Sequence, residues 1–170
     1  MTVCTACVGE PVKLAEPEAA AKSAHLYEVP LKAAGSGLRT EVQAGEFQIV
    51  LDAGRALGGQ QSGPSPVQAF VSSILACTQI TLQVVAGDAG VGPLGDIRWT
   101  AHGVFDTRKL LSNTDTVPHF TSISLHGEVQ GALEQAALDA LVAGTKARCP
   151  ISQSLRPEIA FELKLQRAAA

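Results

Sequence analysis

Two of the four cysteines in this chain stand in settings where a thiol could do chemistry. Cys77 lies in the middle of the apolar segment VQAFVSSILACTQIT, and Cys149 is followed directly by proline in ARCPISQSL. A thiolate is the nucleophile that cleaves a peroxide O–O bond, and a second thiol can condense with the resulting sulfenic acid before further oxidation. If the fold brings Cys77 and Cys149 together, they could carry a two-thiol redox reaction.

Each of these cysteines also has a purely structural interpretation. Free cysteine is among the most buried residue types, and Cys77 shares a helical face with Phe70 and Ile74, so it could be a small core residue. Cys149 could be a core residue at a helix start, although a helix start is also where a thiol pKa falls. The residues alone leave both interpretations open.

The remaining candidate ligands form no pattern that is typical of a metal or nucleotide site. Cys4 and Cys7 form a lone C-x-x-C pair without matched histidines, which is weak support for zinc. The four histidines are dispersed, and Gly58-Gly59 is not part of a G-x-G-x-x-G motif. We therefore expect no metal and no nucleotide cofactor.

Composition sets the class of protein. A chain of 170 residues, 46% hydrophobic and 17% charged, can build one domain with a real core. The formal net charge of -3, with no Lys or Arg cluster longer than a pair, argues against nucleic acid and anionic membrane as partners. Residues 1–24 carry acidic residues and prolines where a signal peptide would need an apolar core, so we expect a cytoplasmic protein.

The first part of the chain predicts an arm, a sheet and a loop. Residues 1–24 lack sustained periodicity and indicate a loose N-terminal arm. The Gly- and Pro-rich segment 53–66 predicts a long surface loop without regular structure. Between the arm and this loop, alternating or β-branched residues predict three strands, at 25–31, 38–45 and 46–52. A hairpin turn at Ala44-Gly45 is expected to join the last two.

The rest of the chain predicts one long helix followed by strands and shorter helices. Ser65 before Pro66 is typical of an N-cap with proline at the first helical position. Apolar residues then cover all faces of the segment through Gly87, which predicts a central, buried helix. Downstream we expect strands at 96–106, 121–131 and 158–166, a helix at Ala132–Gly144 and a tight turn or helix start at Arg148–Pro150.

Strands on both sides of a long helix favour an α+β fold over a doubly wound parallel sheet. A helix that is apolar all round needs cover on every side, and one sheet in a chain this short can hardly provide it. Oligomerisation is the simplest way to cover the remaining faces of the helix.

Taken together, the pattern of GG…GPSP, an apolar helix with A-C-T, and then R-C-P-x-S resembles the OsmC/Ohr superfamily of osmotically inducible and organic hydroperoxide resistance proteins. The resemblance covers roughly residues 35–166, and we assign a single OsmC-like domain to 25–170. It implies antiparallel sheets wrapped around a long central helix in an intertwined homodimer, with two sites between the subunits.

The resemblance also implies roles for individual residues. Cys77 matches the peroxidatic thiol and Cys149 the resolving thiol, close enough together to form a disulfide. A thiolate in an apolar helix needs a cation, and the arginine of the family's N-terminal strands matches Arg39, with Arg55 as second choice. The family's glutamate just after the helix proline is missing, because the chain has Pro66-Val67-Gln68 there. Gln68 could orient the arginine in its place, with a weaker bond.

The expected activity is the thiol-dependent reduction of organic hydroperoxides in oxidative-stress defence, with a thiol reductant as electron donor. The alternative is an OsmC-like dimer without efficient peroxidase activity that binds a small apolar ligand at the subunit interface.

Overall fold

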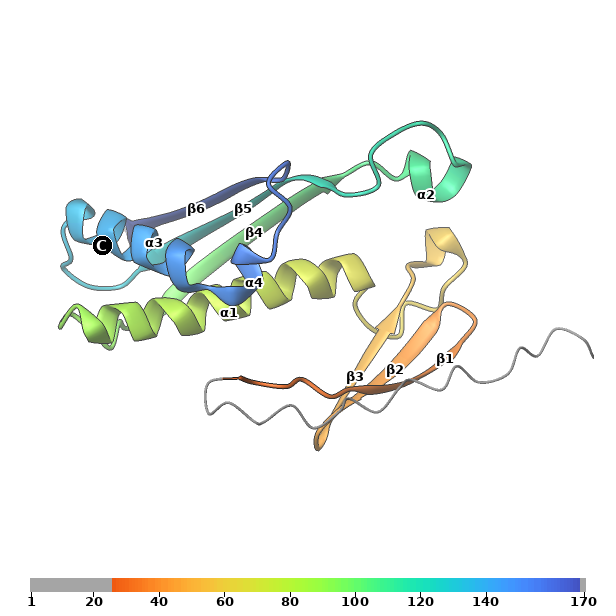
Figure 1. Cartoon of the computed structure of the whole chain (residues 1–170), viewed down its shortest axis with the longest axis horizontal. Helices are drawn as coiled ribbons and strands as arrows, with labels where there is room; N and C mark the ends of the chain where they lie inside the picture. Colours follow the sequence, from red (N-terminus) through yellow and green to blue (C-terminus); the bar gives the residue numbers. More distant parts are fainter. Residues whose placement is uncertain (1–25, 169–170) are drawn as a thin grey trace, which may run out of the picture.

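The computed structural model describes residues 26–168, in which six strands form two three-stranded sheets, one along a long helix and one near the N-terminal end of that helix (Figure 1). The predicted arm at 1–24, with Cys4 and Cys7, lies outside the described residues. The sequence therefore predicts the α+β class correctly.

The first sheet is antiparallel and contains β1 (Lys32–Ser36), β2 (Arg39–Ala44) and β3 (Phe47–Asp52) in that order. Its two tight turns use glycine in the left-handed region, with φ of +60° at Gly37 and +61° at Gly45. Only glycine enters this region without a steric penalty, which is why the chain reverses at these two points. The predicted hairpin at Ala44-Gly45 is confirmed.

The first predicted strand is misplaced. Residues 26–31 form no strand, and β1 begins at Lys32, in the segment that was predicted to separate two strands. The turn at Gly37 pairs Ser36 with Arg39 and folds the short segment before it back along β2. The turn at Gly37 thus determines which residues pair with β2, and the weak alternation of apolar and polar residues in 25–31 does not.

One carboxylate accepts several of the hydrogen bonds that hold the loop between β3 and the long helix. Asp52 at the end of β3 is only 2% exposed, and its Oδ2 accepts the N–H of Gln60 at 3.2 Å, the N–H of Ser62 at 3.0 Å and the Ser62 hydroxyl at 2.9 Å. The predicted loop at 53–66 is confirmed, except that one 3₁₀ turn, η1 (Arg55–Leu57), interrupts it.

The long helix α1 (Pro66–Asp88) begins where the sequence predicts it to begin. The Ser65 hydroxyl accepts the Gln68 N–H at 3.3 Å, and Gln68 Oε1 accepts the Ser65 N–H at 2.8 Å. This reciprocal capping box satisfies two donors at the helix start, and such a cap stabilises a helix by about 1 kcal/mol.

In the single chain α1 buries only one face. Its buried residues are Ile74, Thr78, Thr81, Leu82, Val85 and Ala86. Ile80 is 67% exposed and Val84 48% exposed, so the predicted all-round apolar helix exists but one side of it is uncovered. By length and composition α1 could also cross a membrane, a criterion that the core helix of a folded domain meets equally well.

The second sheet contains β4 (Ile97–Phe105), β5 (Phe120–Val129) and β6 (Ala160–Arg167). β4 and β5 are antiparallel, but β6 runs parallel to β5, so this sheet is mixed. A parallel pair needs a long crossover, which here contains α3 (Gln135–Arg148) and α4 (Pro150–Gln153). A further short helix that we did not predict, α2 (Arg108–Ser112), lies between β4 and β5.

The core lies between the second sheet and the helices α1 and α3, which pack side by side against it. Trp99 of β4 packs against both groups of buried side chains, and its Nε1 donates to Gln79 of α1 at 2.6 Å. α4 packs against α1 as well. The core therefore fixes the middle of α1, where Cys77 lies, against the α3–α4 junction, where Cys149 lies.

Candidate active site

The fold brings together the two cysteines that the sequence singles out. Cys77 Sγ and Cys149 Sγ lie 3.3 Å apart, within hydrogen-bond distance for sulfur. A disulfide has an S–S length near 2.05 Å, so a displacement of about 1 Å would bond them. Cys149 is 0% exposed, whereas Cys77 is partly exposed, so a reactant from solvent reaches Cys77 first.

The break between α3 and α4 places Cys149. Its N–H makes the last helical bond of α3, to the Thr145 carbonyl at 2.9 Å. Pro150 has no N–H and cannot continue α3, so the chain turns at Cys149 and a new helix starts at once. Cys149 is thus the N-cap residue of α4, which places its side chain at the start of that helix.

The surroundings give the two sulfurs different proton affinities. Burial raises the pKa of the Cys149 thiol, but donors outweigh it: the Ser152 N–H and hydroxyl, the Cys77 thiol and the Ile151 N–H hold this pKa below its usual value. Burial raises the pKa of the Cys77 thiol above its usual value, and the Ile151 N–H and Thr81 hydroxyl oppose that only in part. Within one chain the pair therefore loses its first proton more readily from Cys149 than from Cys77.

The arginine that we expected to stabilise the Cys77 thiolate makes its contacts elsewhere in the chain. Arg39 on β2 donates from Nε to the Ser62 hydroxyl at 3.1 Å and forms an ion pair with Glu41. Because Ser62 in turn donates to Asp52, Arg39 belongs to the hydrogen-bond network that holds the loop before α1. Arg55, the second choice, lies exposed in η1. The single chain thus does not bring either arginine together with Cys77, and their role there stays a prediction.

Gln68 has a local task. Its Oε1 accepts both the N–H and the hydroxyl of Ser65, at 2.8 and 3.0 Å, so the oxygen that could orient an arginine is engaged in the helix cap. Cys77 itself lies about two and a half turns further along α1 than Gln68, since an α-helix has about 3.6 residues per turn.

Sequence reasoning missed three groups around the sulfurs, namely Thr81, Ile151 and Ser152. Thr81 follows Cys77 by one helical turn, so its spacing could have shown it. The Ser152 hydroxyl stands three positions after Cys149, the usual spacing between an N-cap residue and its partner. The Ile151 N–H acts on both sulfurs, and only the tertiary structure reveals that.

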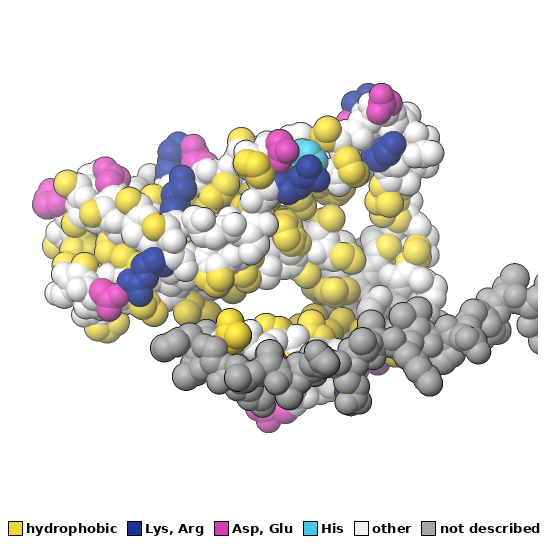
Figure 2. Space-filling view, viewed as in Figure 1, with side chains coloured by type: hydrophobic (Ala, Val, Ile, Leu, Met, Phe, Trp, Pro, Cys, Tyr) yellow, Lys and Arg dark blue, Asp and Glu magenta, His cyan; other side chains and the backbone are white. Residues whose placement is uncertain are grey.

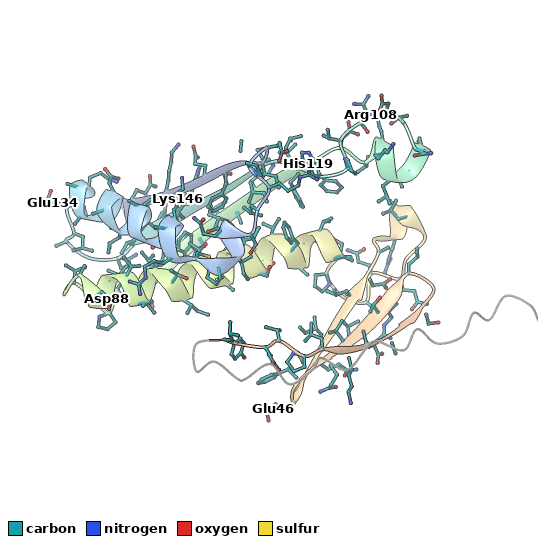
Figure 3. The ribbon with its side chains drawn as sticks, viewed as in Figure 1. Glu46, Asp88, Arg108, His119, Glu134 and Lys146 are labelled. Atoms are coloured by element: carbon teal, nitrogen blue, oxygen red, sulfur yellow. The ribbon has the colours of Figure 1, made fainter. Side chains whose placement is uncertain are left out.

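Charged side chains lie at the periphery rather than beside the thiols. In Figure 3, Glu46 lies at a hairpin tip, Asp88 at the end of α1 and Arg108 on α2. Arg148, next to Cys149 in sequence, donates to Asp88 at 2.5 Å and so ties the end of α3 to the end of α1. Among residues 26–168, no group of three or more His, Cys, Asp or Glu side chains is placed to hold a metal ion.

An apolar groove of about 490 Å³ lies between the first half of α1 and β4. Val67, Val71 and Leu75 of α1 line it together with Phe105 and Phe120 of the second sheet, and His102 and Ser72 add polar atoms. The groove is open and could hold a small apolar molecule.

Comparison with known proteins places the chain in a family. The OsmC-like protein family matches residues 59–164. The chain is 28% identical over 107 residues to the peroxiredoxin OsmC of Escherichia coli strain K12, covering 62% of this chain and 70% of that protein.

Solved structures agree in fold. The OsmC organic hydroperoxide resistance protein of Legionella pneumophila is 26% identical, with a TM-score of 0.65 over 83% of this chain and 98% of its own. An OsmC-like protein of Mycoplasma pneumoniae is 18% identical, with a TM-score of 0.71 over 84% and 99% of the two chains, and shows the fold alone. Membership of this family supports a redox role that is related to peroxides. The chain therefore belongs to the OsmC-like protein family.

Proposed function

We propose that this protein reduces organic hydroperoxides, with Cys77 as the attacking thiolate and Cys149 as the resolving thiol. The observation that carries the proposal is the 3.3 Å separation of the two sulfurs, one partly exposed and one buried. The similarity to an organic hydroperoxide resistance protein supports the choice of substrate.

The reaction needs two thiols and no cofactor. The Cys77 thiolate attacks one peroxide oxygen, the O–O bond breaks, and the alkoxide leaves to take up a proton, which yields an alcohol and a sulfenic acid on Cys77. The Cys149 thiolate then attacks the Cys77 sulfur, the S–S bond forms, and hydroxide leaves to become water. A thiol reductant restores both cysteines with two electrons.

The attacking step requires that Cys77 lose its proton. Burial raises its pKa, so a positive charge must come close before peroxide is attacked. We propose that the partner subunit of a homodimer supplies this charge through Arg39, or through Arg55 if the loop before α1 moves. The dimer and a cytoplasmic location both belong to this proposal.

The proposal is tested by counting thiols, in a Cys4→Ser, Cys7→Ser background so that only Cys77 and Cys149 titrate. One equivalent of an alkyl hydroperoxide should remove two thiols and release one equivalent of alcohol. Cys77→Ser should abolish the reaction, whereas Cys149→Ser should leave a sulfenic acid on Cys77 that a dimedone probe traps. If Cys77→Ser still consumes peroxide at the parent rate, the assigned nucleophile is wrong.

A second candidate function is the binding of a small apolar ligand. The groove beside α1 favours it, since five of its lining side chains are apolar and large. Thiols that survive excess alkyl hydroperoxide, together with saturable binding of a fluorescent fatty acid that Val71→Asp abolishes, would favour this function over the first.

A further inference from the structure

The two reduced thiols are spaced so that one bridging atom could bind both sulfurs. Cys77 Sγ and Cys149 Sγ lie 3.3 Å apart, whereas the sulfurs of a disulfide are about 2.05 Å apart. Among residues 26–168, no group of three or more His, Cys, Asp or Glu side chains is placed to hold a metal ion. Side chains of these types therefore offer a bridging atom two sulfur ligands and no third ligand.

The bond angle at the bridging atom decides which element fits this separation. Zinc–thiolate bonds are about 2.3 Å long, so a tetrahedral centre holds two sulfurs about 3.8 Å apart. A linear centre with the same bond length, as two thiolates form around Cu(I), would hold them about 4.6 Å apart. A bond angle near a right angle gives about 3.3 Å, which is the separation observed. Trivalent arsenic has this geometry, because its lone pair makes it pyramidal.

The charge of an arsenic adduct also fits the site. When an arsenical R–As(OH)₂ meets two thiols, two As–S bonds form and two As–O bonds break, and the thiol protons leave with the hydroxides as two waters. No electron is transferred, and the product is uncharged. Arg148, the charged residue next to Cys149 in sequence, is paired with Asp88. A neutral adduct needs no such partner, whereas Cu(I) between two thiolates would be a buried anion.

The two sulfurs differ in access, and this sets the order of binding. Cys149 is 0% exposed and Cys77 is partly exposed, so arsenic binds Cys77 first and Cys149 second. The third substituent on arsenic, a hydroxyl or an organic group, then lies on the side of Cys77. Because the second As–S bond forms within one molecule, the pair should bind at least about 100-fold more tightly than one thiol.

We propose that Cys77 and Cys149 form a binding site for trivalent arsenicals, because the fold holds the two sulfurs at the spacing that a pyramidal arsenic atom needs. The site does not depend on the proposed peroxidase function, since no peroxide takes part in binding. Bound arsenic occupies both thiols, so it would also block the reduction of hydroperoxides by this pair.

Phenylarsine oxide tests the proposal in the Cys4→Ser, Cys7→Ser background, since the C-x-x-C pair of the parent chain could bind it too. One equivalent should add one phenylarsenic group to the reduced protein by mass spectrometry and remove two thiols by titration. Cys77→Ser and Cys149→Ser should each bind at least about 100-fold more weakly. Zn²⁺ in excess should not displace the arsenical. Displacement by zinc, or equally tight binding by either single-thiol variant, would overturn the proposal.

The unfolded chain is the control for geometry. In urea the two cysteines, 72 positions apart in sequence, are no longer held at a fixed distance, so the affinity should fall by about tenfold or more. Phenylarsine oxide should therefore raise the urea midpoint of the background protein but not that of Cys149→Ser. Equal affinity in urea and in buffer would mean that the fold does not make the site.

The hydroperoxide reaction separates this inference from the proposed function. If the pair binds phenylarsine oxide as expected but does not react with alkyl hydroperoxide, the proposed function fails and the arsenical site stands. If the pair reduces hydroperoxide but binds phenylarsine oxide no better than a single thiol, the arsenical site fails and the proposed function stands.

Discussion

The opposite pKa shifts of the two thiols are the main residue-scale problem in this protein. The pKa of the accessible thiol, Cys77, is raised by burial, whereas donors around the buried thiol, Cys149, lower its pKa. A reduced single chain is therefore set up for resolution but not for attack. This is the physical reason to look for the missing charge outside the chain, since burial without a cation disfavours a thiolate.

Two threonine hydroxyls near the thiols lack partners. Thr78 Oγ1 and Thr145 Oγ1 are buried with no hydrogen-bond partner among the described residues. An unsatisfied buried hydroxyl costs on the order of 1–3 kcal/mol, and valine has the same shape without that cost. Thr145→Val should therefore raise the free energy of unfolding by about 1 kcal/mol, measured by urea denaturation.

The control for this change is Thr121→Val, since the Thr121 hydroxyl donates to the Val104 carbonyl at 3.2 Å on the exposed side of β5. Thr121→Val should change stability by less than about 0.5 kcal/mol, as surface substitutions usually do. A loss of stability in Thr145→Val would show that the hydroxyl has a partner, such as a buried water.

At the scale of elements, the connection from β3 to α1 depends on Asp52. Hydrogen bonds from Ser62 lead the set of donors that hold the pKa of this carboxyl below its usual range, against the effect of burial. A depressed pKa contributes stability that is present above the unfolded-state pKa of aspartate and is lost as the pH falls through the folded-state pKa.

Asp52→Asn should therefore destabilise the protein at pH 7, and the difference from the parent should shrink as the pH falls below about 4, the usual pKa of aspartate. Urea unfolding at several pH values measures this, and limited proteolysis in the loop 53–65 reports the local effect. Asp96→Asn, at an exposed position before β4, is the control and should show no such convergence. A difference that stays constant down to pH 3 would mean that the carboxylate charge is not what holds the loop.

At the scale of the whole molecule, the apolar surface is too open for an isolated subunit. Figure 2 shows hydrophobic side chains on both sides of the opening between α1 and the first sheet, while most charged side chains lie on the outside. Phe47 on β3 is 69% exposed and Ile80 on α1 is 67% exposed. Exposed apolar area of this kind marks an interaction surface, and the dimer that the family resemblance implies would cover it.

We therefore expect an obligate dimer in sedimentation at micromolar concentration. Ile80→Glu should place a charge in the interface and convert the dimer to monomer or unfolded chain, because an unpaired buried charge costs several kcal/mol. Ala140→Glu, at an exposed position on α3, is the control and should leave the dimer intact. A folded parent monomer would contradict the prediction.

The same dimer predicts how Arg39 acts. Arg39→Ala should raise the pKa of Cys77 and slow the first step by about tenfold per pKa unit, whereas Arg55→Ala should do so only if Arg55 is the cation instead. Mixing Arg39→Ala chains with Cys77→Ser chains should raise the activity above that of either variant alone, because one site of the mixed dimer then has both groups. If mixing restores nothing, Arg39 does not act across the interface.

The sequence by itself determined the class of fold and the pair of thiols. The Ser65-Pro66 start of α1, the turn at Gly45 and the proline after Cys149 are local signals, because each depends on the φ angles and N–H groups of a few neighbouring residues. The family pattern then joined Cys77 to Cys149 across the sequence that separates them.

Only the tertiary structure decided what surrounds those thiols. That the Ile151 N–H lowers the pKa of both thiols and that Arg39 contacts Ser62 are consequences of how separate segments pack. The parallel pairing of β6 with β5 likewise depends on a partner far away in sequence. Such pairings leave no local period or propensity, because the energy that selects them comes from burial and hydrogen bonds between segments.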